Sequence, residues 1–196
     1  MDSTAICNLA LAKVGDIAIL SLDDPTPEAR FCKLFYEQTI NELLRLHQWN
    51  WATTFARLSQ TTPSPDIAWQ YAYLLPVDYG RIITFNAFSS AMPRPTYQLG
   101  TGVLYTDESV AEISYVREIT NSDEFDPMFV ELIALKVGAR LARPLAGSLD
   151  IEKTLLGEFS KSLNEARRID ASDNFMPRKQ AWVESDLVRA RWSEVI

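Results

Sequence analysis

The sequence contains few of the residues that reactive or metal-binding sites usually need. Its 196 residues include one histidine, His47, and two cysteines, Cys7 and Cys32. Two cysteines are too few for a disulfide framework, and this pair lacks metal-ligand spacing. Both fall at apolar positions of predicted helices, where a free cysteine packs as a small hydrophobic residue. We therefore expect two reduced thiols in the core, with no metal site and no cofactor.

Long apolar runs and clusters of basic residues are also missing. No stretch approaches the roughly 18 apolar residues of a membrane helix, and the opening "MDSTAICNLALAKVG" lacks the basic region of a secretory signal. Acidic residues outnumber basic ones, 26 to 19, for a net charge of −7. Because phosphate binding depends on clustered Lys and Arg, adhesive contact with nucleic acid is not expected. The sequence predicts a soluble protein made in the cytoplasm, with no membrane partner.

Motifs for catalysis are equally sparse. His47 lies near the end of a predicted helix, where donation to a backbone carbonyl is a simpler role than that of a catalytic base. The "GTG" at 100–102 lies between strands and lacks the helix and lysine of a phosphate-binding loop. Asp23 with Asp24, and "DEFD" at 123–126, suit turns and helix caps. Paired carboxylates are uninformative among so many acidic residues. We predict a protein that is not an enzyme.

Helical patterns stand at both ends of the chain, which at 47% hydrophobic residues can bury a core. The first covers 4–14 and ends at Gly15, and the second begins at Pro27 behind the cap Thr26 and runs to about His47. A third begins with Asp126 and Pro127 and is stopped by Pro144. The fourth follows Ser148 and runs to about 170. Its apolar side is formed by Leu156, Phe159 and Leu163, and its last turn is basic, with Arg167 and Arg168.

Between about 52 and 120 the apolar residues alternate in short pieces broken by Pro, Gly and Ser, which predicts strands. "AWQYAYLL" and "GRIITF" are two of them, and "YQLGTGVLYT" is typical of a hairpin that turns at 100–102. "AEISYVRE" places Ala111, Ile113 and Tyr115 on one face. The stripe of Trp69, Tyr71 and Tyr73 could stack bases or sugars, but the acidic charge favours a core or subunit contact.

These patterns predict an α+β fold: a four-helix bundle with an inserted small antiparallel β-sheet domain and an extended C-terminal arm. The expected parts are 1–51 and 121–170 for the bundle, 52–120 for the β domain and 171–196 for the arm. The arm carries aromatic anchors with mixed charge, which favours docking on a neighbouring protein. Its expected contact residues are Phe175, Met176, Trp182, Leu187, Arg189, Arg191 and Trp192.

The stretch "HQWNWA" at 47–52 places Trp49 and Trp51 where the helical pattern stops and the alternating one starts. In extended backbone, residues two apart point the same way. We expect both indoles to hold the β domain against the bundle, as a structural junction rather than a ligand site.

Four segments together resemble the head-to-tail adaptor proteins of short-tailed bacteriophages, often called tail tubular protein A, and their relatives in other tailed phages and prophages. They are "ICNLALAKVGDIAILSLDDPTPEARFCKLFYEQTINELLRLHQWNWA", "WQYAYLLPVDYGRI", "ISYVREITNSDEFDPMFVELIALKVGARLARPLAG" and "LLGEFSKSLNEARRIDASD". No single motif among them is catalytic, and their order along nearly the whole chain to about residue 173 carries the resemblance. The segment 174–196 matches least well.

The resemblance implies a structural protein of the virion, present as a ring of twelve copies below the portal. The helical part and the arm then engage the portal protein, and the opposite face receives the nozzle or another tail protein. Double-stranded DNA passes through the ring, and an acidic lumen is compatible with sliding without adhesion. Two alternatives stay open: a virion-associated peptidoglycan hydrolase, since some such adaptors have been credited with that activity, and an interaction module unrelated to phages.

Overall fold

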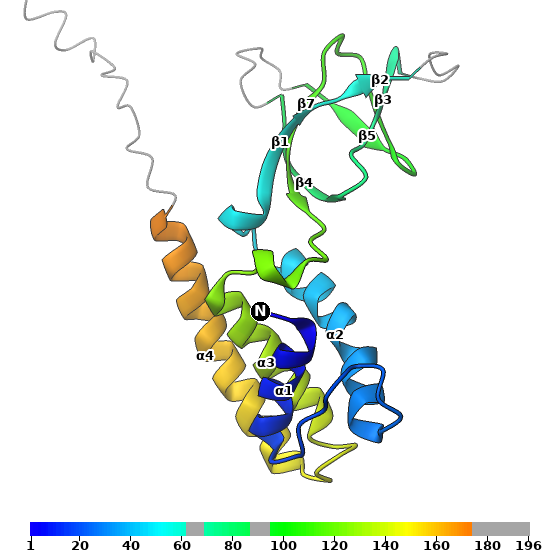
Figure 1. Cartoon of the computed structure of the whole chain (residues 1–196). Coiled ribbons are helices and arrows are strands. Elements are labelled where there is room, and N and C mark those ends of the chain that lie inside the picture. The colour runs from blue at the N-terminus through cyan, green and yellow to red at the C-terminus, as the bar shows by residue number, and fades with distance from the viewer. Residues whose placement is uncertain (62–68, 87–94, 174–196) are drawn as a thin grey trace, which may run out of the picture.

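The computed structural model describes residues 1–61, 69–86 and 95–173 and shows an α+β protein with four helices and small antiparallel sheets (Figure 1). This confirms the predicted fold class. The elements in chain order are α1 Ser3–Val14, α2 Pro27–Leu46, the 3-10 turn η1 Asn50–Ala52, β1 Thr53–Arg57, β2 Ser59–Gln60, β3 Tyr71–Leu74, β4 Tyr79–Phe85, β5 Tyr97–Leu99, β6 Val103–Thr106, β7 Glu112–Arg117, the 3-10 turn η2 Ser122–Glu124, α3 Pro127–Leu141 and α4 Leu149–Asp173.

The ends of three helices follow the predicted caps. Gly15 takes a left-handed backbone (φ 76°) and ends α1. The Thr26 hydroxyl accepts the N–H of Ala29 at the start of α2, and the Asp126 carboxylate accepts the N–H of Met128 at the start of α3. These local interactions explain why the three boundaries could be predicted within about two residues.

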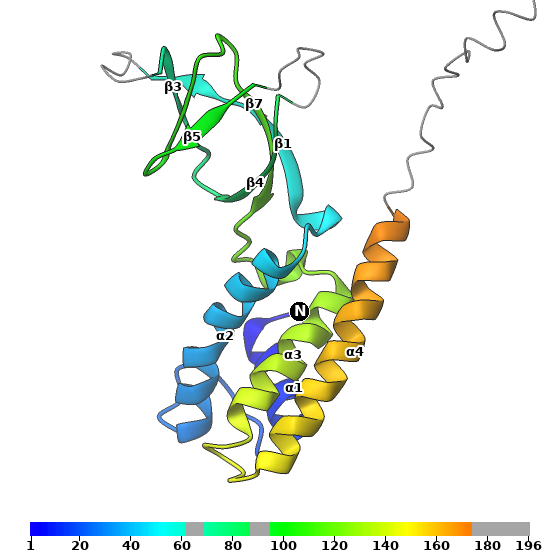
Figure 2. The ribbon, with the colours of Figure 1, turned by 180° about the vertical axis from the view of Figure 1, so that it is seen from behind.

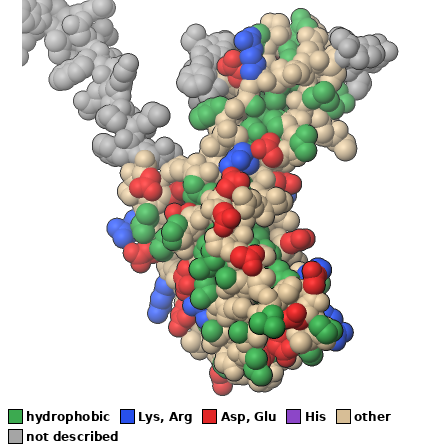
Figure 3. Space-filling model, viewed as in Figure 1, with side chains coloured by type: hydrophobic (Ala, Val, Ile, Leu, Met, Phe, Trp, Pro, Cys, Tyr) green, Lys and Arg blue, Asp and Glu red, His purple; other side chains and the backbone are tan. Residues whose placement is uncertain are grey.

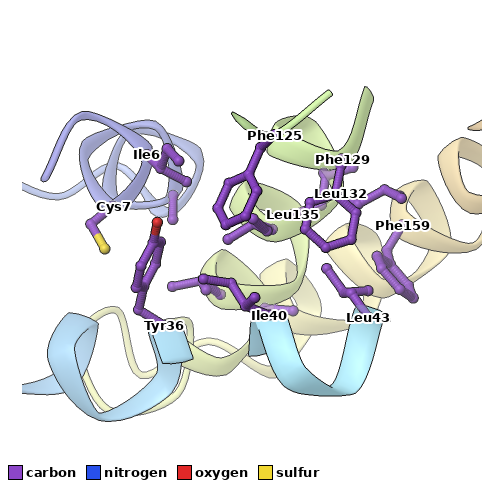
Figure 4. Packing of buried hydrophobic residues seen from close by; sticks show 14 of the residues in the cluster. Ile6, Cys7, Tyr36, Ile40, Leu43, Phe125, Phe129, Leu132, Leu135 and Phe159 are labelled. Atoms are coloured by element: carbon purple, nitrogen blue, oxygen red, sulfur yellow. The ribbon is translucent and has the colours of Figure 1, made fainter. Parts of the chain in front are cut away.

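The helices pack around α3, which contacts the other three. Gly138 permits a close approach of α1 and α4 to α3, because a Cβ there would lie 3.2 Å from the backbone oxygen of Ala10 and 3.3 Å from Leu155 Cδ1. Large apolar side chains from all four helices meet in one cluster (Figure 4). The side chains labelled there that are buried in this cluster are Ile6, Cys7, Tyr36, Ile40, Leu43, Phe125, Phe129, Leu132, Leu135 and Phe159.

The fourth helix differs from the prediction in three respects. It continues to Asp173, so residues 171–173 are helical and Arg167 and Arg168 do not lie in its last turn. Leu155 is buried instead of Leu156, which is 37% exposed. The buried positions Leu155, Phe159, Ala166 and Asp170 follow one helical face, and this is the face that α4 buries where it packs on α3.

The β residues form two antiparallel sheets where we expected one. Their strand orders are β1-β7-β4 and β2-β3-β6-β5. Residues from both sheets meet in a second, smaller cluster that consists of Leu58, Tyr73, Leu104, Ala111, Ile113 and Tyr115. Ala111, Ile113 and Tyr115 therefore share a face as predicted, whereas the neighbouring Val116 belongs to the helical cluster. Seen from behind, the strands lie beyond one end of the helices (Figure 2).

The predicted hairpin is present, with β5 and β6 paired on either side of residues 100–102. Gly102 has φ 71°, which a residue with a Cβ adopts only with strain. A Cβ on Gly100 would lie 2.8 Å from the ring of Tyr105, so this glycine leaves room for the ring to pack against the turn.

Candidate functional site

The two junction tryptophans both contact Phe129 of α3. Trp49 is 2% exposed, with its ring centroid 5.4 Å from that of Phe129, and its Nε1 donates to the carbonyl of Leu43 at 2.9 Å. Trp51 lies 4.9 Å from Phe129 and 6.1 Å from Phe125, centroid to centroid. The backbone between them is the 3-10 turn η1, so the expected extended conformation is wrong. The rings converge because Phe129 lies between them.

His47 bonds a carboxylate, where a backbone carbonyl was expected. Its Nε2 lies 3.0 Å from Oδ2 of Asp170, and its ring stands edge-on to Trp49 with the centroids 4.8 Å apart. The carboxylate of Asp170 also accepts the backbone N–H of Asn50 at 2.9 Å, and the Asn50 side chain donates to the Asp170 carbonyl. Asp170 therefore connects the end of α2, the turn η1 and the last turns of α4.

Asp170 was missed by sequence reasoning, although its position carried a signal. It continues the apolar face of α4 at helical spacing after Phe159 and Ala166, and a carboxylate at such a position needs hydrogen-bond donors from another element. His47 contacts Asp170 and Trp49, and Asp170 contacts His47 and Asn50, so the cluster joins α2, η1 and α4. We interpret the cluster as structural.

The two cysteines are free and buried, as predicted. Their thiols contact each other between α1 and α2, and the hydrogen bond to Cys32, together with burial, raises the pKa of Cys7 above its usual value. A raised pKa keeps a thiol protonated and unreactive at neutral pH. In the described part of the chain, no group of three or more His, Cys, Asp or Glu is placed to hold a metal ion. No helix there is long and apolar enough to cross a membrane.

The aromatic stripe of Trp69 with Tyr71 and Tyr73 of β3 belongs largely to the core, as we expected. Tyr73 is buried in the β cluster, and its hydroxyl donates to the carbonyl of Glu108 at 2.8 Å. Tyr71 is half-buried against Tyr73, and Trp69 Nε1 donates to Gln98 Oε1 at 3.0 Å. Stacking of a base or sugar would have to displace these contacts.

Several apolar side chains of the α1–α2 loop and of α2 are exposed or only partly buried. We call these residues the loop-end surface: Ile17, Leu20, Phe31 and Leu34. Leu20 is 94% exposed and Leu34 62% exposed, and Phe31 and Leu34 line a hollow of about 320 Å³. The loop is held in a defined shape. Asn8 exchanges two hydrogen bonds of 2.9 Å with the backbone of Ile19, and Asp24 accepts the N–H groups of Leu20 and Ser21. These hydrogen bonds fix the backbone of the loop that carries the exposed Leu20.

A second surface, the sheet surface, lies on the three-stranded sheet β1-β7-β4. Phe55 of β1 is 69% exposed beside a hollow of about 210 Å³, which Thr84, Glu112 and Ser114 also line. Figure 3 shows apolar side chains on both the β part and the helices, with most of the visible acidic side chains over the helices. Both surfaces escaped sequence reasoning because an exposed Leu or Phe has no signature along the chain.

The predicted contact residues of the arm lie outside the described residues. These are Phe175, Met176, Trp182, Leu187, Arg189, Arg191 and Trp192. The C-terminal arm therefore stays a prediction, as do the contacts it was expected to make.

No protein-family model matches the chain, and no curated protein matches it at a significant level.

Proposed function

We propose that the protein is a structural head-to-tail adaptor of a tailed bacteriophage. In this proposal the four helices form a bundle that carries the inserted β domain, and twelve copies form a ring below the portal. The C-terminal arm and the helical part bind the portal protein, and a tail protein binds the opposite face. The protein is made in the host cytoplasm, becomes part of the virion, and lets double-stranded DNA pass without sequence-specific binding.

One observation carries the proposal: exposed apolar side chains occur on both the helical part and the β part of the molecule. The loop-end surface belongs to the helical part, and the sheet surface with Phe55 belongs to the β part. An adaptor needs two contact surfaces for different partners, and apolar groups at the centre of such surfaces supply most of the binding energy. The net charge of −7 supports a lumen to which DNA does not adhere.

The role of the lone histidine supports a structural protein over a hydrolase. His47 contacts a buried carboxylate on one side and Trp49 on the other, and both contacts hold the chain together. We infer that the protein is not an enzyme.

The decisive experiment is to mix the purified protein with the portal ring from the same phage and measure the mass of the complex. We expect the protein alone to be monomeric or weakly associated, and the ring to gain about twelve copies. A portal ring that gains no mass contradicts the proposal. Deletion of 174–196 should preserve thermal unfolding yet weaken docking, and unchanged docking would remove the arm from the proposal.

A further inference from the structure

A groove between the helical and β parts collects three arginines from three elements. The last turns of α2 supply Arg45, β4 supplies Arg81 and β7 supplies Arg117. They line a hollow of about 170 Å³ together with Asn41, Val116 and Glu118. We call it the waist groove. It shares no residue with the loop-end surface, the sheet surface or the tryptophan junction.

Two of these arginines have no acceptor in the described parts of the chain. Arg45 is exposed and makes no hydrogen bond or ion pair there. The Nε of Arg81 is buried and lacks a hydrogen-bond partner. Arg117 donates to Glu124 at 3.0 Å, so part of its charge is already compensated. A buried guanidinium nitrogen without an acceptor is unfavourable, so a ligand oxygen toward which Arg81 reorients would remove that cost.

The backbone is shaped to bring Arg81 to this place. The pairing of β4 with β7 shifts register between Tyr79 and Arg81, and such irregularities redirect a side chain. Gly80 lies at the shift, where a Cβ would come within 2.9 Å of the Val116 carbonyl oxygen. The glycine thus allows β4 to approach β7 closely, which places Arg81 opposite Val116 and beside Arg117.

We propose that the waist groove is a binding site for the carboxylates of an acidic protein segment. The planar guanidinium offers pairs of parallel N–H groups that match the two oxygens of a carboxylate. The Nε–H group is one member of such a pair. In this proposal Arg81 turns its guanidinium toward the hollow that it lines, and Arg45 supplies a second charge. This inference does not depend on the adaptor role.

Charge favours a carboxylate over the phosphates of nucleic acid. A nucleic acid presents a dense row of charges and binds through extended basic surfaces, whereas the waist groove is a local cluster on a chain of net charge −7. Glu118 also lines the groove and limits its net positive charge. One or two carboxylates fit this balance.

The test measures binding of a fluorescently labelled hexaglutamate peptide to the full-length protein by anisotropy at low ionic strength, with hexaglutamine as the neutral control. Wild-type protein should bind hexaglutamate, more weakly as salt is added. The double variant Arg45→Gln, Arg81→Gln should bind it at least about ten-fold more weakly. Glu118→Gln should bind it a few-fold more tightly, because a repulsive charge is removed. Arg57→Gln, an exposed arginine of β1 outside the groove, is the matched control and should bind like wild type.

Three results overturn the proposal: no binding by wild type, equal binding by the double variant, or an equal loss in Arg57→Gln. Tighter, arginine-dependent binding of a short DNA duplex replaces it with a nucleic-acid site. If Arg81→Gln lowers the thermal unfolding temperature, the single variant Arg45→Glu carries the test, since Arg45 is exposed on α2. Its charge reversal should abolish peptide binding, and undiminished binding overturns the proposal.

Discussion

The helical part and the β part of this protein differ in the size of their buried cores. The helical cluster draws on all four helices and includes many side chains with no exposure, among them Ile6, Leu43, Phe129 and Leu132. Among the described residues the β cluster has six buried members, of which Leu104 and Ala111 are completely covered. Two thin sheets with two edge strands each cannot enclose a core as four packed helices do. We infer that most of the folding free energy lies in the helices.

The β part is nevertheless tied to the helical cluster at two places. Strand β7 places Ile113 and Tyr115 in the β cluster and Val116 in the helical cluster. The turn η1 is held by Asp170, and the flanking tryptophans contact Phe129. Because of these contacts, we expect the smaller cluster to depend on the larger one for part of its stability. The following predictions test how far that dependence goes.

The largest effect is expected for Trp49→Ala. The indole is buried against Phe129 and donates to Leu43, so its removal leaves a cavity and an unsatisfied carbonyl. We expect a loss of about 3 to 5 kcal/mol in the free energy of unfolding, measured by urea denaturation. Trp69→Ala, a half-buried tryptophan of the β part, should cost less than about 1 kcal/mol. Equal costs would mean that the helical part is not the more stable one.

A smaller and more local effect is expected for Leu104→Ala. The side chain is fully buried, but the small β cluster can partly collapse around the space, so we expect a loss of about 2 kcal/mol. Amide hydrogen exchange should accelerate in the strands and leave α1 and α3 protected. Leu74→Ala, on an exposed position of β3, is the control. Accelerated exchange in all four helices would show that the two parts unfold as one unit.

Asp170→Asn tests the link between α4 and the β part. The change removes the charge that faces His47 while an oxygen remains for the N–H of Asn50. We expect a loss of about 1 to 2 kcal/mol and faster exchange at η1 and β1. Asp173→Asn, exposed in the same helix end, should change neither. An unchanged stability in Asp170→Asn would contradict the proposed link.

The smallest effects on stability are expected for substitutions of two tyrosines. The Tyr115 hydroxyl donates to Asp78 at 2.9 Å, so Tyr115→Phe should cost about 1 kcal/mol. The Tyr36 hydroxyl makes no hydrogen bond of ordinary geometry within the described residues, although Ser122 lies near it, so Tyr36→Phe should cost little. Thermal unfolding of the two variants at neutral pH checks the order. A larger cost for Tyr36→Phe would reverse the interpretation.

The same tyrosines predict an alkaline dependence. Burial raises the pKa of Tyr36 from 10 to about 12, and burial followed by the bond to Asp78 raises the pKa of Tyr115 to about 12. The folded state thus binds more protons than the unfolded state above pH 10. The contribution of the two tyrosines to the free energy of unfolding is therefore fully present below pH 10 and is lost as the pH rises toward 12. In urea titrations across this range, each Tyr→Phe variant should show a shallower fall than wild type, and an equal slope would contradict these shifts.

Sequence reasoning succeeded where a structure is set by neighbours along the chain. The caps at Thr26 and Asp126, the glycine end of α1 and the hairpin at 100–102 each involve residues within a few positions of one another. The features that the sequence did not predict depend on residues that are distant along the chain. Leu155 replaced Leu156 in the core because α3 fixed the rotation of α4, and η1 formed where Asp170 and Phe129 are available to hold it.

The sequence by itself determined the α+β class, the approximate bounds of the helices and the reduced, buried state of the two cysteines, because periodicity and capping act over one or two turns. Only the tertiary structure decided the rest. The division into two sheets, the carboxylate partner of His47, the exposed apolar surfaces and the meeting of Arg45, Arg81 and Arg117 all join residues far apart in the chain. Such groupings depend on how elements pack, and packing leaves no local pattern in the residues that it brings together.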